Sequence, residues 1–220
     1  MKLPWIAVCL LCATAPAAAQ DETAPNQVAV ETPVPETQLR SSDLAFNEAV
    51  QAVRDKNFRR AIELFLPLAE DGAADAQFNL AVLLRLGRGR PQNFGEAYFW
   101  AAMSALGGEE RALELVDELN GILPEKERET IVKSLTDRLT KQIESGDDGA
   151  PEKLARVHAD FAVSPDLESA FIWFSICHAL GKPECQDGMD RVAEDMPAET
   201  IVKLQAQAAE VFEQSAFSRP

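Results

Sequence analysis

The chain has 220 residues and is strongly acidic, with 21 lysines and arginines against 36 aspartates and glutamates, which gives a formal net charge of −15. This excess of negative charge repels phosphate backbones and anionic lipid surfaces, so it argues against nucleic acid and membrane surfaces as partners. Two interpretations of the charge remain, a solvated acidic surface and a surface that attracts a basic partner.

Residues 1–19 have the features of an export signal. Lys2 supplies a positive charge, residues 6–13 are mainly apolar, and Ala17 and Ala19 offer a small-residue cleavage site. The apolar stretch is shorter than the ~20 residues that a membrane-spanning helix needs. We therefore predict a cleaved signal peptide, a periplasmic or secreted protein, and no stable membrane insertion after cleavage. An uncleaved segment lying at the membrane interface is the alternative.

Residues 20–41 are rich in Pro, Thr, Glu, Gln and Ala and contain almost no large apolar side chain. Such a stretch cannot bury enough apolar surface to offset the entropy that it would lose on ordering. We predict a disordered linker here, followed by a folded domain over residues 42–220.

The sequence of the folded part predicts helices joined by short turns. Apolar residues recur three and four positions apart, and no stretch alternates between apolar and polar residues as a β-strand does. Gly87 and Gly89 mark one turn, and a polar break at 144–149 separates two halves. Asn93 and Asp166 each precede an apolar segment and can cap its helix by accepting a bond from a backbone N–H. The sequence therefore predicts an all-α fold built as one continuous array.

Trp100 and Trp173 lie within similar stretches of sequence. We call the number of residues that separates them along the chain the repeat offset. Beyond Pro124 the offset shortens by three, because the pentapeptide that begins at Glu129 returns at Glu199. The chain is therefore predicted to consist of repeated helical units, each packed on its neighbour. Further pairs at the repeat offset are Asn93 and Asp166, Ala97 and Ala170, Gly108 and Gly181, and Pro124 and Pro197.

The clearest unit, residues 73–108, carries small, aromatic and turn residues in a fixed order: Ala76, Phe78, Leu80, Leu83, Gly87, Gly89, Asn93, Ala97, Trp100, Ser104, Ala105 and Gly108. This order resembles the Sel1-like repeat, a relative of the tetratricopeptide repeat. The departures are mild, with Ala81 standing where that family has glycine and Leu84 where it has tyrosine. The helix pairs at about 43–71 and 109–145 look like generic hairpins rather than clear members of the family.

A second, degenerate copy over about 149–181 keeps Asp166, Ala170, Trp173 and Gly181 but lacks the two turn glycines. The resemblance implies a right-handed solenoid of αα-hairpins, in which the alanines allow close helix approach and the tryptophans fill the gap between hairpins. The glycines would turn the chain at positive φ. It also implies that an unknown protein or peptide binds on the concave face.

Removal of the signal peptide would leave two of the four cysteines, Cys177 and Cys185. An even pair in an exported protein is typical of a disulfide. A reversal at Gly181 can bring the two α-carbons within the ~4.4–6.8 Å that such a bond requires. The spacing is also similar to that of cysteine-rich Sel1-like proteins, where the bridge staples one hairpin to the next. Two buried free thiols are the alternative.

The sequence offers no catalytic, cofactor or metal motif, such as a P-loop, G-x-S-x-G, H-E-x-x-H or C-x-x-C. His158 and His178 cannot build a zinc site alone. Cys177 and His178 are neighbours on a predicted helix, so their side chains diverge by ~100° and do not face each other. We therefore expect no enzyme, no cofactor and no metal.

The leading hypothesis is a non-catalytic interaction scaffold of the bacterial cell envelope. Its partner would bind side chains that stacking leaves free on the inner helix, Gln77 and Arg85, with Arg88 and Arg90 just beyond in the densest basic cluster. The alternative for these arginines is that they only balance nearby carboxylates. The second hypothesis is a cell-wall-directed or β-lactam-binding enzyme, because some cysteine-rich Sel1-like proteins are linked to penicillin binding. The lack of an activated serine, paired base or metal set argues against it.

Overall fold

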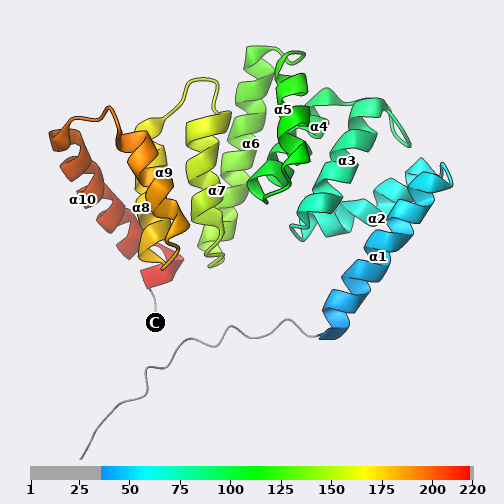
Figure 1. The fold of residues 1–220 in the computed structure, drawn as a ribbon, viewed down its shortest axis with the longest axis horizontal. Helices are drawn as coiled ribbons and strands as arrows, with labels where there is room; N and C mark the ends of the chain where they lie inside the picture. The colour runs from blue at the N-terminus through cyan, green and yellow to red at the C-terminus, as the bar shows by residue number, and fades with distance from the viewer. Residues whose placement is uncertain (1–35, 219–220) are drawn as a thin grey trace, which may run out of the picture. The chain divides into compact units, whose positions relative to one another are not determined.

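The computed structural model describes the backbone of residues 36–218 and the side chains of residues 42–218. The predicted signal peptide and most of the predicted linker lie outside this range. Within it the chain forms helices and no strands, and none of these helices combines the length and apolar character that crossing a bilayer requires (Figure 1). The described α-helices are α1 (Glu36–Arg54), α2 (Phe58–Glu70), α3 (Ala74–Leu86), α4 (Phe94–Leu106), α5 (Arg111–Asn120), α6 (Glu125–Glu144), α7 (Ala150–Arg156), α8 (Leu167–Ala179), α9 (Glu184–Ala193) and α10 (Ala198–Gln214).

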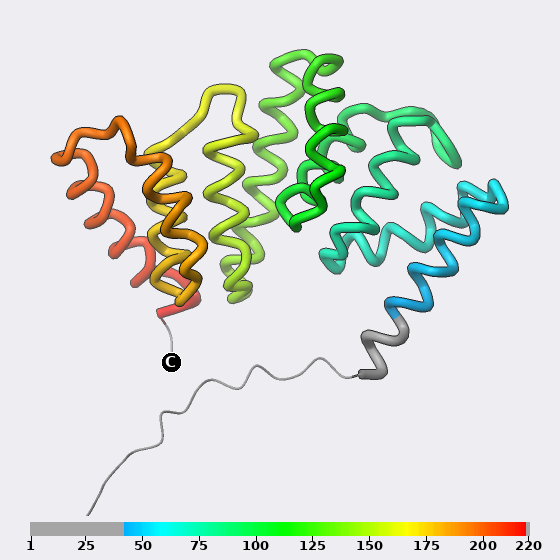
Figure 2. Tube along the Cα trace, viewed as in Figure 1, coloured from blue at the N-terminus to red at the C-terminus, as the bar shows by residue number. Residues whose placement is uncertain are grey.

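The helices pack in chain order as a series of antiparallel hairpins, a path that Figure 2 follows from α1 to α10. The short helix α5 packs on α4 and is bypassed by α6, which packs on α4 directly. Helices α9 and α10 relate to α8 in the same way. This arrangement confirms the predicted all-α solenoid of αα-hairpins.

Helix α1 begins at Glu36, before the predicted start of the folded domain at residue 42. Residues 36–41 contain no proline or glycine. A helix that is already anchored by packing extends into such a segment at little cost, because propagation adds one hydrogen bond for each residue that it fixes. The last part of the predicted linker is therefore helical.

The two halves of the chain keep the repeat offset throughout. The paired helix starts are Phe94 and Leu167, Arg111 and Glu184, and Glu125 and Ala198, and each pair is separated as Trp100 is from Trp173. The predicted shortening of the offset after Pro124 is therefore wrong at the level of structure.

Burial shows the same register within the last helix of each half. Ile131 is buried in α6, and its counterpart at the repeat offset, Leu204, is buried in α10, whereas Ile201 at the shorter offset is only half-buried. Pro124 and Pro197 stand immediately before α6 and α10 in extended conformation and determine where each helix begins. The shared pentapeptide simply lies three residues earlier in α10.

The predicted caps form at the start of α4 and of α8. The side chains of Asn93 and Asp166 accept bonds from the backbone N–H groups of Glu96 and Ser169, both at 3.0 Å. Each cap satisfies an N–H that the first turn of a helix leaves without a partner. Gly87 ends α3 in the left-handed conformation, with φ of 64°, as the turn pattern predicts.

The second copy has no glycine at this turn and ends α7 differently. The helix continues into a π-helical turn, Val157–Phe161 (η1), in which Ala162 N–H donates to the Val157 carbonyl five residues back at 3.0 Å. A π-turn accommodates an extra residue without a positive φ. The helix can therefore stop at Ala162, whose φ is −64°.

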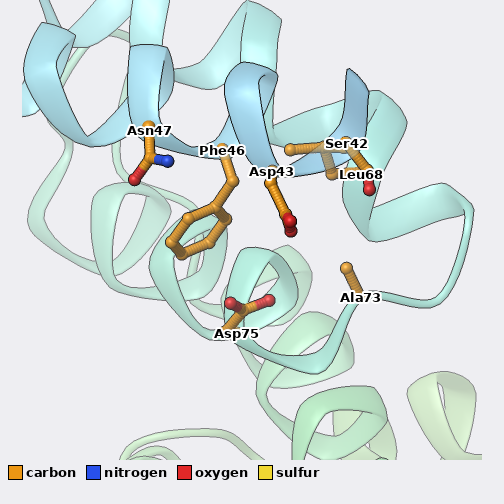
Figure 3. Close-up of a pocket in the computed structure, with 7 residues that line it drawn as sticks. All are labelled: Ser42, Asp43, Phe46, Asn47, Leu68, Ala73 and Asp75. Carbon is orange, nitrogen blue, oxygen red and sulfur yellow. The ribbon is translucent and has the colours of Figure 1, made fainter. Parts of the chain in front are cut away.

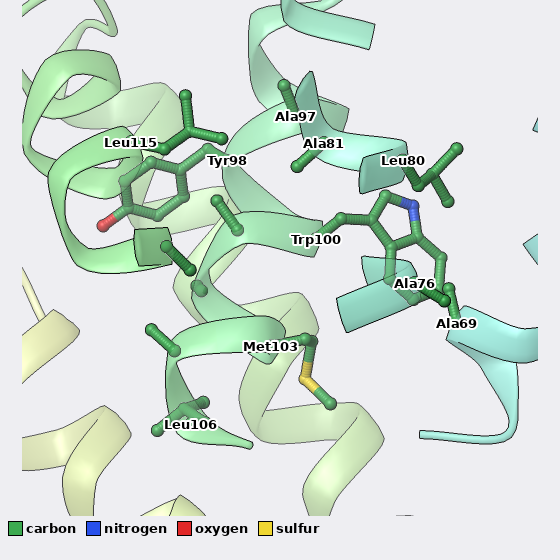
Figure 4. Close-up of a cluster of buried hydrophobic side chains, with 14 of the residues drawn as sticks. Ala69, Ala76, Leu80, Ala81, Ala97, Tyr98, Trp100, Met103, Leu106 and Leu115 are labelled. Atoms are coloured by element: carbon green, nitrogen blue, oxygen red, sulfur yellow. The ribbon is translucent and has the colours of Figure 1, made fainter. Parts of the chain in front are cut away.

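The core of the first half is built around α4. Figure 4 shows the Trp100 ring beside Leu80, Ala76 and Ala69, while Tyr98 points in another direction toward Leu115. Trp100 is 6% exposed and Tyr98 is 1% exposed. The small neighbours leave room for the indole, so Trp100 fills the space between hairpins as predicted.

Trp173 has a different role from Trp100. Its side chain is half-buried and packs against both hydrophobic clusters, the large one that extends from α1 to η1 and a smaller one formed by α7, η1, α8, α9 and α10. Trp173 therefore connects the two clusters, and its burial is less complete than that of Trp100.

Candidate functional site

A cluster of arginines forms where the α3–α4 loop lies against the start of α2. Gly89 has φ of 82°, and a Cβ added there would stand 2.6 Å from the carbonyl carbon and oxygen of Phe58. The Arg88 guanidinium carbon lies 5.1 Å from the centroid of the Phe58 ring. Only glycine lets the loop approach α2 this closely, and the approach brings the loop arginines next to those of α2.

Two arginines of α2 join this surface, which the sequence did not link to the loop because the two segments lie far apart along the chain. Arg59 and Arg60 lie on the first turn of α2. Arg59 and Arg90 line a hollow of about 380 Å³, together with Ile62, Glu63, Gly89 and Pro91. We name Arg59, Arg60, Arg88 and Arg90 the basic edge.

The arginines of the predicted cluster do not share one partner or one direction. Arg85 pairs with Glu118 of α5 at 2.6 Å and is partly buried, with 29% of its side chain exposed. Arg90 pairs with Glu96 at 3.3 Å. Arg88 stacks on an aromatic ring and has no carboxylate partner among the described residues. Arg85 therefore belongs to the packing of α3 on α5, while Arg88 and Arg90 remain accessible.

The α2 arginines are likewise paired at the surface. Arg60 pairs with Glu48 at 2.8 Å, and Arg59 with Glu63 at 3.5 Å. The Arg59 side chain is 85% exposed. Ion pairs as exposed as these contribute little to stability, so the carboxylates of a partner can replace them at low cost.

Gln77 was predicted to be a free side chain for partner binding, and this prediction is wrong. It is 1% exposed, and its Nε2 donates to the Ala69 carbonyl at 2.9 Å. Its position three, four and seven residues before the buried Leu80, Ala81 and Leu84 places it on the buried stripe of α3. That spacing in the sequence already indicated that Gln77 is buried, but its polar side chain favoured the opposite prediction.

Cys177 and Cys185 form a disulfide that joins α8 to α9, with a distance of 6.0 Å between their α-carbons. Both cysteines are buried. Their counterparts in the first half, at the repeat offset, are Ser104 and Ala112, which are also fully buried and join α4 to α5 without a covalent bond. The disulfide therefore staples the hairpin of the second half at a position where the first half relies on packing alone.

The two histidines lie apart and in different surroundings. His158 in η1 is half-buried, with its Nδ1 3.7 Å from an Asp166 carboxylate oxygen. Burial lowers the pKa of His158 below its ordinary value, and the Asp166 charge opposes this shift. His178 is exposed and adjoins a cysteine that is already bonded. In the described part of the chain, no group of three or more His, Cys, Asp or Glu side chains is placed to hold a metal ion.

A second hollow, of about 280 Å³, lies between α1 and the start of α3. Figure 3 shows Asp43 and Phe46 of α1 around it, opposite Asp75, with Leu68 and Ala73 at its side. The Phe46 ring packs edge-on against Phe65, with 5.6 Å between their centroids. The two carboxylates of this hollow, Asp43 and Asp75, make it a poor site for an anionic partner.

Comparison with protein families finds the Sel1 repeat at three stretches, residues 54–72, 74–109 and 154–176. The second coincides with the clearest predicted unit, and the third lies within the predicted degenerate copy. The first covers the second helix of the pair at about 43–71, so this part of the pair is more than the generic hairpin that the sequence suggested. The predicted generic pair at 109–145 is unmatched after its first residue.

A comparison with curated proteins found no match. Among solved structures, the chain is similar to a protective antigen of uropathogenic Escherichia coli strains that displays an SLR fold, with 16% identity and a TM-score of 0.34. The similarity covers 82% of this chain and 47% of that protein, so the chain spans about half of its length. The three matches show that the chain contains Sel1 repeats, and its consecutively packed hairpins agree with them.

Proposed function

We propose that this protein is a non-catalytic scaffold of the bacterial cell envelope that binds an acidic segment of a partner protein at its basic edge. Helical repeats of this kind present extended surfaces for protein binding. The disulfide between Cys177 and Cys185 suits an oxidising compartment outside the cytoplasm. The concave face as the site of binding stays a prediction from the family resemblance.

The observation that carries the proposal is the clustering of positive charge on a chain of net charge −15. Arg59 of α2 and Arg90 of the loop line one hollow, and Arg60 and Arg88 lie next to them in the two segments, although carboxylates outnumber basic residues in the chain as a whole. Arg88 has only the Phe58 ring beneath it, which leaves its guanidinium donors for a carboxylate in the planar geometry that arginine favours. An acidic peptide therefore fits this edge better than any other described arginine-bearing surface.

The test is charge reversal at the basic edge in the double variant Arg59→Glu and Arg88→Glu. The full chain serves as bait for an envelope extract, and we expect the reversal to abolish capture of a partner that the wild type retains. Melting of the variant should stay near that of the wild type, since both side chains are exposed. The captured partner should also elute as salt is raised, because exposed charges are screened over about 10 Å at 0.1 M.

A matched control reverses two exposed lysines elsewhere, Lys126→Glu and Lys203→Glu, which have no carboxylate partner among the described residues. This variant carries the same change in net charge and should still capture the partner. Capture that survives the reversal at the basic edge, or loss of capture in both variants alike, would overturn the proposed site.

The alternative hypothesis, a β-lactam-binding enzyme, gains no support from the described residues. The buried Ser104 hydroxyl donates to the Ala74 carbonyl at 2.6 Å, and His158 faces Asp166 rather than a serine. Incubation of the full chain with a fluorescent penicillin tests the alternative. We expect no covalent label, and a stoichiometric label would overturn the non-catalytic proposal.

A further inference from the structure

A second surface lies at the C-terminal end of the described array, where α8, α9 and α10 surround an apolar hollow of about 370 Å³. We name this surface the distal face. It shares no residue with the basic edge and does not depend on the proposed function there. Six of its nine lining residues are Ser175, His178, Ala179, Met189, Ala208 and Phe212.

The residues one repeat offset earlier show which part of the first half corresponds to the distal face. The counterparts of these six residues in the first half are all buried, and those of the other three lining residues are half-buried. The six buried counterparts are Ala102, Ala105, Leu106, Val116, Leu135 and Leu139. On the distal face, His178 and Ala179 are exposed instead, and Met189 and Phe212 are only half-buried. Apart from Ala208, which stays buried, these positions are therefore interior in the first half and partly or fully exposed in the second.

In the first half, helix α7 packs beside these positions. It packs on α6, and four apolar residues of α7 and η1 join the large cluster, at a spacing of four, three and four. This stripe consists of Ala150, Leu154, Val157 and Phe161. This element is therefore an amphipathic helix of about three turns.

A basic side chain completes this interface. Arg156 of α7 donates to the carbonyls of Ala105 and Leu106, at 3.1 and 3.3 Å, at the C-terminal end of α4. The last carbonyls of a helix lack intrahelical donors and carry partial negative charge, so a cation there is favourable. The equivalent carbonyls in α8 belong to His178 and Ala179, and no described side chain donates to them.

We propose that the distal face binds an amphipathic helix of a partner protein, which packs an apolar stripe into the hollow and directs an arginine or lysine to the C-terminal end of α8. Charge supports this occupant over a second copy of the chain. Glu213 stands on the rim where the first half has the neutral Thr140. An arginine or lysine on the docked helix is attracted to Glu213, whereas a second copy of a chain with net charge −15 is repelled.

The test uses the α7 sequence as a surrogate for the partner helix. A fluorescent peptide with the sequence of residues 148–163 is titrated into the full chain, up to about 1 mM, and binding is followed by anisotropy. We expect saturable binding that weakens at least about tenfold when the peptide carries Arg156→Glu. The variant Ala209→Arg, which fills the hollow from an exposed position of α10, should bind at least about tenfold more weakly than wild type.

Two controls separate the distal face from other causes. Gln207→Arg places the same side chain on an exposed position of α10 outside the hollow and should leave binding unchanged. The basic-edge variant of Arg59 and Arg88 should also bind normally. No binding, equal binding by Ala209→Arg, or indifference to the charge at peptide position 156 would overturn the proposal. Self-association of the full chain in sedimentation that Ala209→Arg abolishes would also overturn it, by showing a second copy in the hollow.

Discussion

Replacing both cysteines of the α8–α9 bridge by alanine should lower the free energy of unfolding by about 2.5 kcal/mol. The bridge joins residues separated by 8 positions, and the loop entropy that such a crosslink removes from the unfolded chain corresponds to this value at 25 °C. Alanine should fit both positions without a clash, because the first half already has the small residues Ser104 and Ala112 there, fully buried. The loss should therefore reflect the missing crosslink rather than a disrupted helix pair.

Urea denaturation of the full chain, followed by tryptophan fluorescence, measures this loss. A reducing agent should bring the wild type close to the double variant and leave the variant unchanged. The bridge itself can be located by mass spectrometry, because trypsin does not cut between Lys182 and Pro183 and so leaves Cys177 and Cys185 in one peptide, residues 157–191. Unreduced protein should yield this peptide two hydrogens lighter and resistant to alkylation.

Two outcomes would refute this account of the bridge. Alkylation of both cysteines in the unreduced peptide would show that the thiols are free. A loss of stability below about 1 kcal/mol in the double variant, with the bridge present in the wild type, would show that the unfolded chain gains little freedom from its removal.

Three further predictions concern residues that the fold holds in particular surroundings. Trp100→Ala should lower the free energy of unfolding by about 3–5 kcal/mol. Trp173→Ala should lower it less in the same urea titration, because the Trp173 side chain is half-buried. Equal losses in the two variants would contradict this difference in burial. Gly89→Ala should destabilise more than Gly108→Ala, since both have positive φ but only the former would place a Cβ against backbone, and similar losses would show that the loop simply moves aside. Burial lowers the pKa of His158 in the folded state. Its neutral form therefore contributes stability above the unfolded pKa of about 6.5, and this stability is lost as pH falls. His158→Gln should reduce the loss of unfolding free energy between pH 7.5 and 5.5, and an unchanged loss would exclude this histidine as its source.

The sequence predicted the helix caps and the turn glycines because these depend on local chemistry. Asn93 and Asp166 needed only a helix start beside them, and Gly87 needed only a turn that requires positive φ. The pentapeptide at Glu129 and Glu199 misled for a related reason. A shift of three residues rotates a helix by only about 60° from a full turn, so the apolar pattern looks equivalent in either register. Only the helix starts, which Pro124 and Pro197 determine, distinguish the full repeat offset from the shorter one.

The basic edge could not be predicted because it depends on a contact between segments. Arg59 and Arg60 are near Arg88 and Arg90 only because Gly89 brings the loop onto the start of α2. Periodicity within a helix carries no information about which loop crosses its end. The misplaced Gln77 is the opposite case, since its helical spacing did indicate burial and residue type was given more weight.

The two halves differ most at the surface that α7 packs beside in the first half and that forms the distal face in the second. This difference indicates how a repeat array can offer a binding surface for a partner. Positions inside the unit stay buried although their residues change, as in Ser104 and Cys177 or Leu135 and Ala208. Of the positions that α7 packs beside in the first half, Ala105 is replaced by the exposed His178. The larger imidazole has to move aside at the surface before a copy of α7 can dock, so the α7 peptide should bind the distal face less tightly than α7 packs on the first half. The second half has therefore retained the interior of the repeat while changing its outer contact, as expected if the distal face binds a helix that resembles α7 but leaves room for His178.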